Sequence, residues 1–271
     1  MYCELKGAKT VDKALQTPLV EDILQELKEA LKKHHTIDVI TLTANGEPTL
    51  YPQLEELIKG IKALNTKHKL LILSNGSTIT NPTMQTILSS LDIVKLSLDC
   101  VNSVCFKKLD RAHKGIDVLE IVEGMKAFRK LYRGELVIEV LVVEGINDTQ
   151  EAFLALNHVL QEIQPNRVDI GTIDRPPAYA IKGVSVERLV ELSSLIENLH
   201  VNIAYAKQYS AQKRTFSEEE ILELLKRRPQ SFEDVKLCFD DTSVENLQNL
   251  LANERLHVKE IVGVKFYTCE S

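Results

Sequence analysis

The chain has 271 residues, of which 44% are hydrophobic, and its formal net charge at pH 7 is -6. This length allows one large α/β domain with a small appendage. No apolar run approaches the roughly 20 residues of a membrane-spanning helix, and the net acidity argues against a broadly basic surface for nucleic acid.

The sequence carries no feature of an exported protein. No secretory or transit signature opens it, and its cysteines show no pattern of a disulfide framework. The five are Cys3, Cys100, Cys105, Cys238 and Cys269. We therefore expect a cytoplasmic protein in a reducing compartment, with no membrane partner.

Helices and strands are predicted to alternate over residues 1–207, with a turn signal after each strand. The expected strands cover residues 39–43, 70–73, 93–98, 136–143, 167–173 and 201–206. The expected helices cover residues 17–31, 53–64, 81–91, 117–132, 148–163 and 185–199, the fifth of them opened by a capping box of Asp148 and Glu151. This alternation is typical of a parallel sheet with right-handed crossovers, and it predicts a partial (β/α)6 TIM-like barrel.

Polar residues recur at alternate positions on three of these strands. They are Thr41 and Thr43, then Lys95, Ser97 and Asp99, then Glu139. Strands that are buried on both faces are nearly all apolar, so this pattern predicts a wet barrel lumen that contains a site. Lys95 and Glu139 are equally consistent with a buried ion pair that serves structure alone.

The first candidate for a ligand-binding turn is Asn45-Gly46-Glu47-Pro48, which lies between a predicted strand and a predicted helix. In α/β folds, ligands bind just outside the carboxyl ends of the strands. Gly46 lets the backbone approach a ligand closely, and Glu47 places a carboxylate at the mouth. The alternative is an ordinary connection in which Glu47 caps the next helix.

Four segments at the strand ends, taken in order, resemble those of the radical S-adenosylmethionine (SAM) superfamily. They read TANGEP at 43–48, LSNG at 73–76, KLSLD at 95–99 and VEGINDT at 143–149. The order is most similar to the wyosine-synthase-like branch of iron-sulfur oxidoreductases. At the start of the chain, Tyr2-Cys3-Glu4-Leu5 resembles the end of the family's CxxxCxxC motif, in which an aromatic residue precedes the last cysteine.

This resemblance implies a 4Fe-4S cluster held by three thiolates, with SAM bound to its fourth iron. An electron from the cluster, delivered by a donor such as flavodoxin or ferredoxin, cleaves SAM to a 5′-deoxyadenosyl radical that takes hydrogen from the substrate. The sequence does not identify the substrate or a catalytic residue, and RNA is the substrate class that the branch implies. The resemblance assigns cofactor contacts to Asn45, Gly46, Glu47, Pro48, Asn75, Ser97, Asp99, Glu139 and Asn147, and it assigns Cys3 to the cluster.

The cluster motif is where this sequence departs from the family. Only Cys3 of the three expected cysteines is present, and Cys100 and Cys105 do not have the family's spacing. One thiolate does not hold a cluster, so we expect an N-terminally shortened form that lacks the first strand and part of the cluster loop. Upstream coding DNA without in-frame codons for CxxxC would instead favour a degenerate protein without a cluster.

The end of the chain is expected to form a separate module. A polar linker over 208–214 precedes predicted helices over 217–228, 232–239 and 243–253 and a hairpin over 258–267, an order that resembles a winged helix over 215–271. From Thr215 to Ser271 there are 7 Lys and Arg against 12 Asp and Glu, a net charge of -5. Because nucleic-acid affinity depends on neutralising phosphates, we expect this module to pack on the barrel or to bind protein.

Three functions follow from these patterns. The first is a radical SAM enzyme. The second is a cluster-less barrel that acts as a binding or regulatory protein through its C-terminal module. The third, an unrelated barrel enzyme such as an aldolase, is disfavoured because no strand lysine beyond Lys95 has the setting of a Schiff-base lysine.

Overall fold

The computed structural model describes residues 17–33, 37–43, 46–173, 181–204, 213–227, 229–261 and 264–269. The chain divides into two compact units, residues 1–205 and 206–271. Each unit has its own hydrophobic core.

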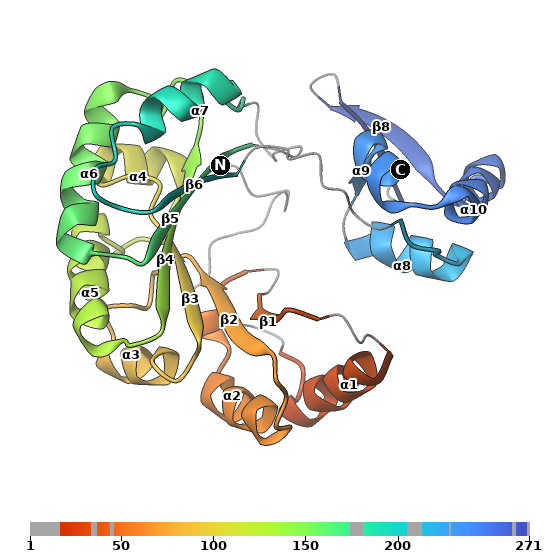
Figure 1. Ribbon diagram of the computed structural model, residues 1–271, viewed down its shortest axis with the longest axis horizontal. Coiled ribbons are helices and arrows are strands. Elements are labelled where there is room, and N and C mark those ends of the chain that lie inside the picture. The colour runs from red at the N-terminus through yellow and green to blue at the C-terminus, as the bar shows by residue number, and fades with distance from the viewer. Residues whose placement is uncertain are drawn as a thin grey trace. The chain divides into compact units, whose positions relative to one another are not determined.

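Six parallel strands form the sheet of the N-terminal unit, in the order β1-β2-β3-β4-β5-β6 (Figure 1). Their bounds are β1 Val39–Leu42, β2 Lys69–Ser74, β3 Ile93–Ser97, β4 Glu135–Val142, β5 Arg167–Thr172 and β6 Val201–Ala204. Because each strand pairs in parallel with the next one in the sequence, all their carboxyl ends lie at one edge. The expected partial TIM-like barrel is confirmed.

Helices connect these strands and cover the outer face of the curved sheet (Figure 1). They are α1 Val20–Lys33, the 3-10 turn η1 Pro48–Leu50, α2 Leu54–Ala63, α3 Pro82–Leu88, α4 Ser103–Leu109, α5 Val118–Leu131, α6 Gln150–Ile163 and α7 Val186–Ser193. Their buried apolar side chains, such as Met125, Phe128 and Phe153, join the outward-facing residues of the strands in one core.

The two faces of β4 differ in polarity. Leu136, Ile138 and Val140 face the helices and are fully buried. Glu135 and Glu139 lie on the other face, which is partly exposed. The alternation of polar and apolar residues therefore places the polar set on the lumen side of the sheet, as predicted.

Two local features differ from the sequence prediction. Helix α4 lies between the expected strand over 93–98 and the expected helix over 117–132, where no helix was predicted, and it begins with the Asn102 side chain accepting the backbone N–H of Cys105 at 2.9 Å. Helix α6 is capped by Thr149 instead of the predicted capping box, because Asp148 accepts the N–H of Gly145 at 2.9 Å and so closes the preceding turn.

The described residues of the C-terminal unit form three helices and a three-stranded sheet. Their bounds are α8 Glu218–Arg227, β7 Gln230–Ser231, α9 Phe232–Cys238, α10 Asp241–Ala252, β8 His257–Ile261 and β9 Val264–Thr268. The strands are antiparallel and lie in the order β7-β9-β8. The core includes Ile221, Phe239, Leu247 and Leu250. The three helices and the hairpin were predicted, whereas strand β7 was not.

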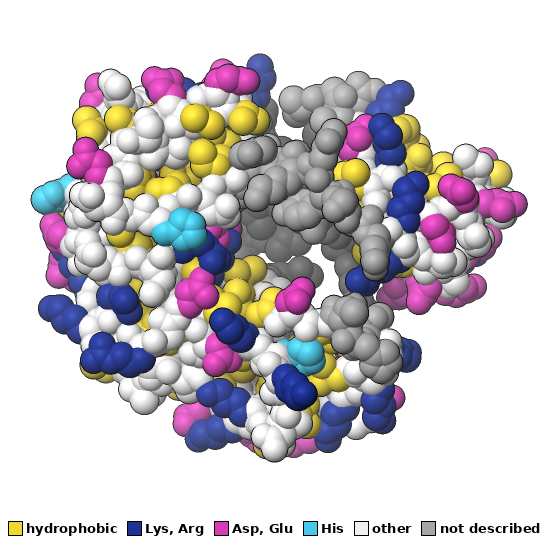
Figure 2. Space-filling model, viewed as in Figure 1, with side chains coloured by type: hydrophobic (Ala, Val, Ile, Leu, Met, Phe, Trp, Pro, Cys, Tyr) yellow, Lys and Arg dark blue, Asp and Glu magenta, His cyan; other side chains and the backbone are white. Residues whose placement is uncertain are grey.

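Charged side chains are mixed by sign over the N-terminal unit, as Figure 2 shows for one face. None of the described helices combines the length and the apolar composition that crossing a membrane requires.

Candidate functional site

The turns after β1 and β2 are joined by the carboxylate of Glu47. Its Oε1 atom accepts the backbone N–H and the hydroxyl of Thr49, at 3.0 and 2.6 Å, and so caps the η1 turn. The same oxygen accepts the Ser74 hydroxyl at 2.8 Å, and Oε2 accepts the backbone N–H of Asn75 at 2.7 Å. The capping role foreseen for Glu47 is therefore present, and both oxygens also fix the edge of the sheet.

Gly46 and Pro48 differ in their surroundings. Gly46 has a φ of +146°, a conformation that favours glycine, and a Cβ atom placed on it would meet nothing within 4 Å. Pro48 is buried at the start of η1. The backbone at Gly46 is thus open to a ligand, whereas Pro48 belongs to the scaffold. The predicted contact Asn45 lies outside the described residues.

The end of β3 is tied to the loop after β4 by two buried polar residues. Asp99 Oδ1 accepts the N–H of Leu141 at 2.7 Å. Asn147, which is 2% exposed, donates to the carbonyls of Asp99 and Leu141 at 2.8 Å and accepts the N–H of Val143 at 2.8 Å. These bonds hold the strand ends in place, and they use both amide protons of Asn147, so its side chain has no donor left for a cofactor.

Asn75 and Ser97 are the remaining predicted contacts at this edge. Asn75 is exposed, and its side chain accepts the N–H of Ser77 at 2.9 Å. Ser97 is partly exposed at the end of β3 and lies beside Glu139 in the register of the sheet. The side chains of Asn75, Ser97 and Glu139 therefore come from three neighbouring strands at the same edge.

Lys95 lies in the lumen between two carboxylates. Its Nζ atom is 2.6 Å from Glu139 Oε1 and 3.0 Å from Asp169 Oδ2, and the Lys95 and Asp169 side chains are only 17% and 9% exposed. Burial alone would lower the pKa of Lys95, but the two carboxylates outweigh it and the pKa is raised. Lys95 therefore stays charged and is paired, which excludes the neutral amine that a Schiff-base lysine needs.

Asp169 connects this group to a second ion pair. Arg167 donates from Nε to Asp169 Oδ1 at 2.8 Å and from Nη1 to Glu135 Oε1 at 2.7 Å. Burial would raise the pKa of Asp169, but its bonds with Arg167 and Lys95 lower it. A chain of alternating charges thus crosses three strands along the lumen.

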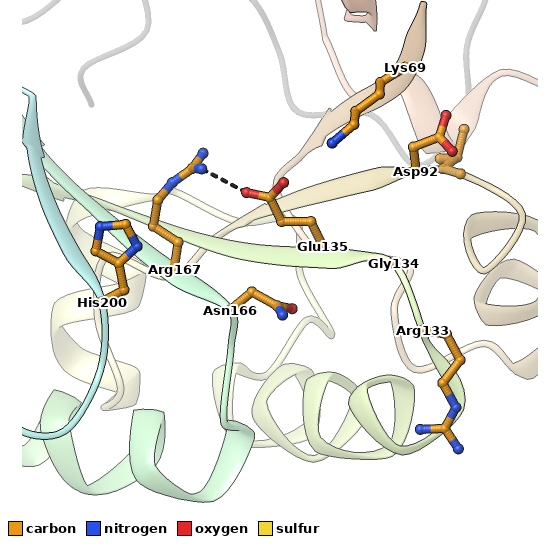
Figure 3. Close-up of a pocket in the computed structure, with 9 residues that line it drawn as sticks. Lys69, Asp92, Arg133, Gly134, Glu135, Asn166, Arg167 and His200 are labelled. Carbon is orange, nitrogen blue, oxygen red and sulfur yellow. Dashed lines mark hydrogen bonds and ion pairs between the residues drawn. The ribbon is translucent and has the colours of Figure 1, made fainter.

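A cavity of about 680 Å³ lies at the opposite edge, where the strands begin. Figure 3 shows Arg167 pointing toward Glu135 in this cavity, while Arg133 points away from the other labelled side chains. Its lining consists of Lys69, Leu91, Asp92, Arg133, Gly134, Glu135, Asn166, Arg167 and His200. None of the predicted cofactor contacts belongs to this edge.

Asp99 also faces a second carboxyl group, Asp110, which follows helix α4. Burial, the like charge of Asp99 and a hydrogen bond between the two side chains raise the pKa of Asp110 to about 8. The pair therefore holds a proton at neutral pH. Sequence patterns missed Asp110 because its partner Asp99 is on a different element. They also missed Asp169, although it is a carboxylate between the apolar residues Val168 and Ile170 of a strand.

The described cysteines do not form an iron-sulfur site. Cys100 and Cys105 are joined by a disulfide bond, which the sequence did not predict, and Cys238 and Cys269 lie in the C-terminal unit. No three His, Cys, Asp or Glu side chains meet in a metal-binding group within the described residues. Cys3 is outside them. The described part of the chain thus offers no thiolate set that fits a cluster.

Comparison with known proteins shows which family this sequence is similar to. The sequence model of the Radical SAM superfamily matches residues 1–156, a range that contains all four strand-end segments. A "UPF0026 protein" of Helicobacter pylori is 37% identical to this chain over 269 residues, which are 98% of this chain and 87% of that protein.

Two solved structures share the fold. Streptococcus suis SuiB bound to precursor peptide SuiA matches with a TM-score of 0.56 at 19% identity, over 76% of this chain and 47% of its own. A radical SAM methyltransferase from Sphaerobacter thermophilus matches with a TM-score of 0.52 at 16% identity, over 69% of this chain and 57% of its own. At these identities the likeness concerns the fold alone.

Proposed function

This chain belongs to the radical SAM superfamily, and on that premise we propose that it binds SAM at the carboxyl edge of its sheet and takes part in reductive cleavage of SAM. The observation that carries the proposal is that the four family-like segments follow four neighbouring strands, β1 to β4, and so meet at one edge. Ligands of barrels with parallel strands bind at this edge.

Within this edge we assign different tasks to the predicted residues. Gly46 gives the ligand access to the backbone, and Asn75, Ser97 and Glu139 offer polar side chains that are at least partly exposed. Glu47, Asp99 and Asn147 use their polar atoms to hold the turns in position.

A bound 4Fe-4S cluster would supply the electron that cleaves SAM, and a donor such as flavodoxin or ferredoxin would reduce it. We propose Cys3 as one ligand of this cluster. The remaining work falls to the chain's own residues, which orient SAM and keep the lumen polar beneath it.

The proposed substrate reaches into the lumen, where Lys95, Glu139 and Asp169 present charged groups. We propose RNA as the substrate class. The basis is the resemblance to the wyosine-synthase-like branch, not a feature of the site itself. A cluster-less binding protein is less favoured, because the family match covers all four strand-end segments.

We further propose that the C-terminal unit is a winged-helix-like module that binds protein in the cytoplasm. Its helix-strand-helix-helix-hairpin order supports the first part. Helix α10, in the place of a recognition helix, carries Asp241 and Glu245 and no Lys or Arg, which speaks against contact with phosphates. Titration of this segment with RNA or DNA at low salt tests the proposal, and tight, steeply salt-dependent binding would refute it.

The enzyme assignment is tested by anaerobic reconstitution with iron and sulfide, followed by dithionite and SAM, of the chain with and without an added N-terminal segment that supplies CxxxC. In the lengthened protein we expect the visible absorbance of a cluster and formation of 5′-deoxyadenosine, both reduced in Cys3→Ala. A colourless protein that leaves SAM intact would contradict the assignment, and SAM retention in equilibrium dialysis would then show whether the binding site alone is present.

A further inference from the structure

Helix α4 is attached to the end of β3 at both of its own ends. At its first turn, Cys105 is bonded to Cys100, with the two Cα atoms 5.7 Å apart. Directly after its last residue, the buried carboxyl group of Asp110 lies close enough to that of Asp99 for the two to interact. The two attachments start from consecutive residues, Asp99 and Cys100, so both act on the point where β3 leaves the sheet.

The position of this disulfide gives it little value as a structural staple. Five positions separate the two cysteines in the sequence. The constraint that a disulfide places on the unfolded chain grows with the length of the loop it closes, so a loop this short gains least. The surrounding unit already has a large apolar core, which includes the α4 residues Phe106 and Leu109.

The same bond is well placed for chemical exchange. Cys100 is buried, whereas Cys105 is partly exposed beside Val104, which is 80% exposed. Cys105 is therefore the more accessible of the two cysteines, and the buried Cys100 is held where its sulfur can resolve a mixed disulfide. In the reducing compartment that the composition predicts, persistent disulfides are rare and those that form are mostly transient, catalytic or redox-sensing.

We propose that Cys100 and Cys105 form a reversible dithiol-disulfide site that exchanges with small disulfides and thiols of the glutathione class and controls how firmly helix α4 is held over Asp99. In the oxidising direction, the Cys105 thiolate attacks glutathione disulfide and releases one glutathione. The Cys100 thiolate then attacks the Cys105 sulfur and releases the second. The two cysteines lose two protons and two electrons, and glutathione disulfide becomes two molecules of glutathione.

The exchange is tested on the full chain, equilibrated anaerobically in buffers with increasing ratios of oxidised to reduced glutathione, quenched with acid, alkylated and digested with trypsin. One peptide, residues 96–107, carries both cysteines. As the ratio of oxidised to reduced glutathione rises, we expect this peptide to change in a single transition from a form with two alkyl groups to a form with none. The form without alkyl groups should have the mass of the unmodified dithiol peptide less two hydrogen atoms, as an internal disulfide requires. Peptides with Cys238 and Cys269 serve as internal controls, and we expect neither to lose its alkyl group through an internal disulfide.

Two results would overturn the proposal. One is a peptide that stays fully alkylated at every ratio, since no disulfide then forms. The other is a peptide that stays oxidised in excess reduced glutathione, since the bond is then a permanent staple. Cys105→Ser, a change at the more accessible sulfur, is expected to abolish the internal disulfide and leave Cys100 as a thiol or a glutathione adduct.

The effect on α4 is read by hydrogen exchange of residues 103–109. We expect severalfold faster exchange in the reduced wild-type protein, and in Cys105→Ser at either glutathione ratio, than in the oxidised wild type. Equal exchange in the oxidised and reduced protein would refute control of α4. None of these measurements needs SAM, a cluster or activity, so their outcome is separate from that of the proposed function.

Discussion

Glu47 Oε2 accepts the backbone N–H of Asn75 at 2.7 Å, so the turn after β1 is fixed to the turn after β2. The other oxygen of the same carboxylate accepts the hydroxyls of Thr49 and Ser74. A carboxylate with both oxygens bonded in this way sets the distance between two strand ends. The edge of the sheet at which we place SAM is therefore shaped before any ligand binds.

Replacing Glu47 with Gln tests this connection. The amide nitrogen of Gln cannot accept a hydrogen bond, so at least one donor at the edge loses its partner. We expect the free energy of unfolding of the N-terminal unit to fall by about 1–2 kcal/mol in urea titrations. Glu56→Gln is the control, because Glu56 is exposed and its side chain accepts a hydrogen bond from the side chain of Gln53, and we expect its free energy of unfolding to change by less than about 0.5 kcal/mol. Equal effects would contradict the connecting role.

Replacing Lys95 with Met tests the ion pairs of the lumen. The change leaves Glu139 and the buried Asp169 without their shared cation, although Asp169 keeps Arg167. We expect a loss of roughly 2–4 kcal/mol in the free energy of unfolding. Lys59→Met is the control, because Lys59 lies 2.6 Å from Glu55, the same distance as Lys95 from Glu139, but its side chain is 73% exposed. We expect this change to lower the free energy of unfolding by less than about 0.5 kcal/mol. If Lys95→Met lowered the free energy of unfolding no more than Lys59→Met does, the charged side chains of the lumen would be hydrated rather than buried.

The Asp99–Asp110 pair predicts a pH dependence of stability. Asp110 ionises near pH 4 in the unfolded chain but keeps its proton up to about pH 8 in the folded protein. Its contribution to stability is fully present below about pH 4 and is lost as the pH rises toward 8. We expect Asp110→Asn to unfold less readily than wild type at pH 8, by roughly 1–3 kcal/mol, with a smaller gain at pH 5. The exposed Asp38→Asn is the control, and a gain independent of pH would be evidence against the shared proton.

Asn147 is predicted to be a structural residue. Asn147→Leu leaves the N–H of Val143 and the carbonyls of Asp99 and Leu141 without this partner in a buried setting. We expect a loss of about 2–4 kcal/mol in the free energy of unfolding. Gln150→Ala, at the exposed first residue of α6, is the control, and we expect it to leave the free energy of unfolding unchanged. If Asn147→Leu instead kept full stability and lost SAM binding, the cofactor role would be restored.

Sequence patterns predicted the six strands because each is a short segment rich in apolar residues, in some cases alternating with polar ones, that is followed by a polar turn, as in LSNG at 73–76. Helix α4 was missed because seven residues are too short a segment to establish a helical period. The cap of α6 was misplaced by one residue because both Asp148 and Thr149 are good caps, and only the turn at Gly145 decides between them.

The site was harder to predict than the fold because its contacts join residues that are far apart in the sequence. Asp110 and Asp169 acquire their roles from Asp99 and Lys95, and no local spacing reports those pairs. The Cys100–Cys105 bond was missed for a different reason, since it depends on how α4 folds back on β3. A family resemblance also assigns ligand contacts without showing which polar atoms the scaffold already uses, as at Asn147.

The central claim is that SAM binds at the carboxyl edge of the sheet. The most direct test is equilibrium dialysis of labelled SAM with the wild-type chain, with Glu139→Gln and with Glu135→Gln. Both residues lie on the lumen face of β4, but Glu139 is near the carboxyl edge and Glu135 begins the strand. We expect wild type and Glu135→Gln to bind SAM with the same affinity. We expect the affinity of Glu139→Gln for SAM to be roughly tenfold lower, a loss of about 1.4 kcal/mol in binding free energy. Failure of the wild-type chain to retain SAM, or a loss confined to Glu135→Gln, would contradict the account.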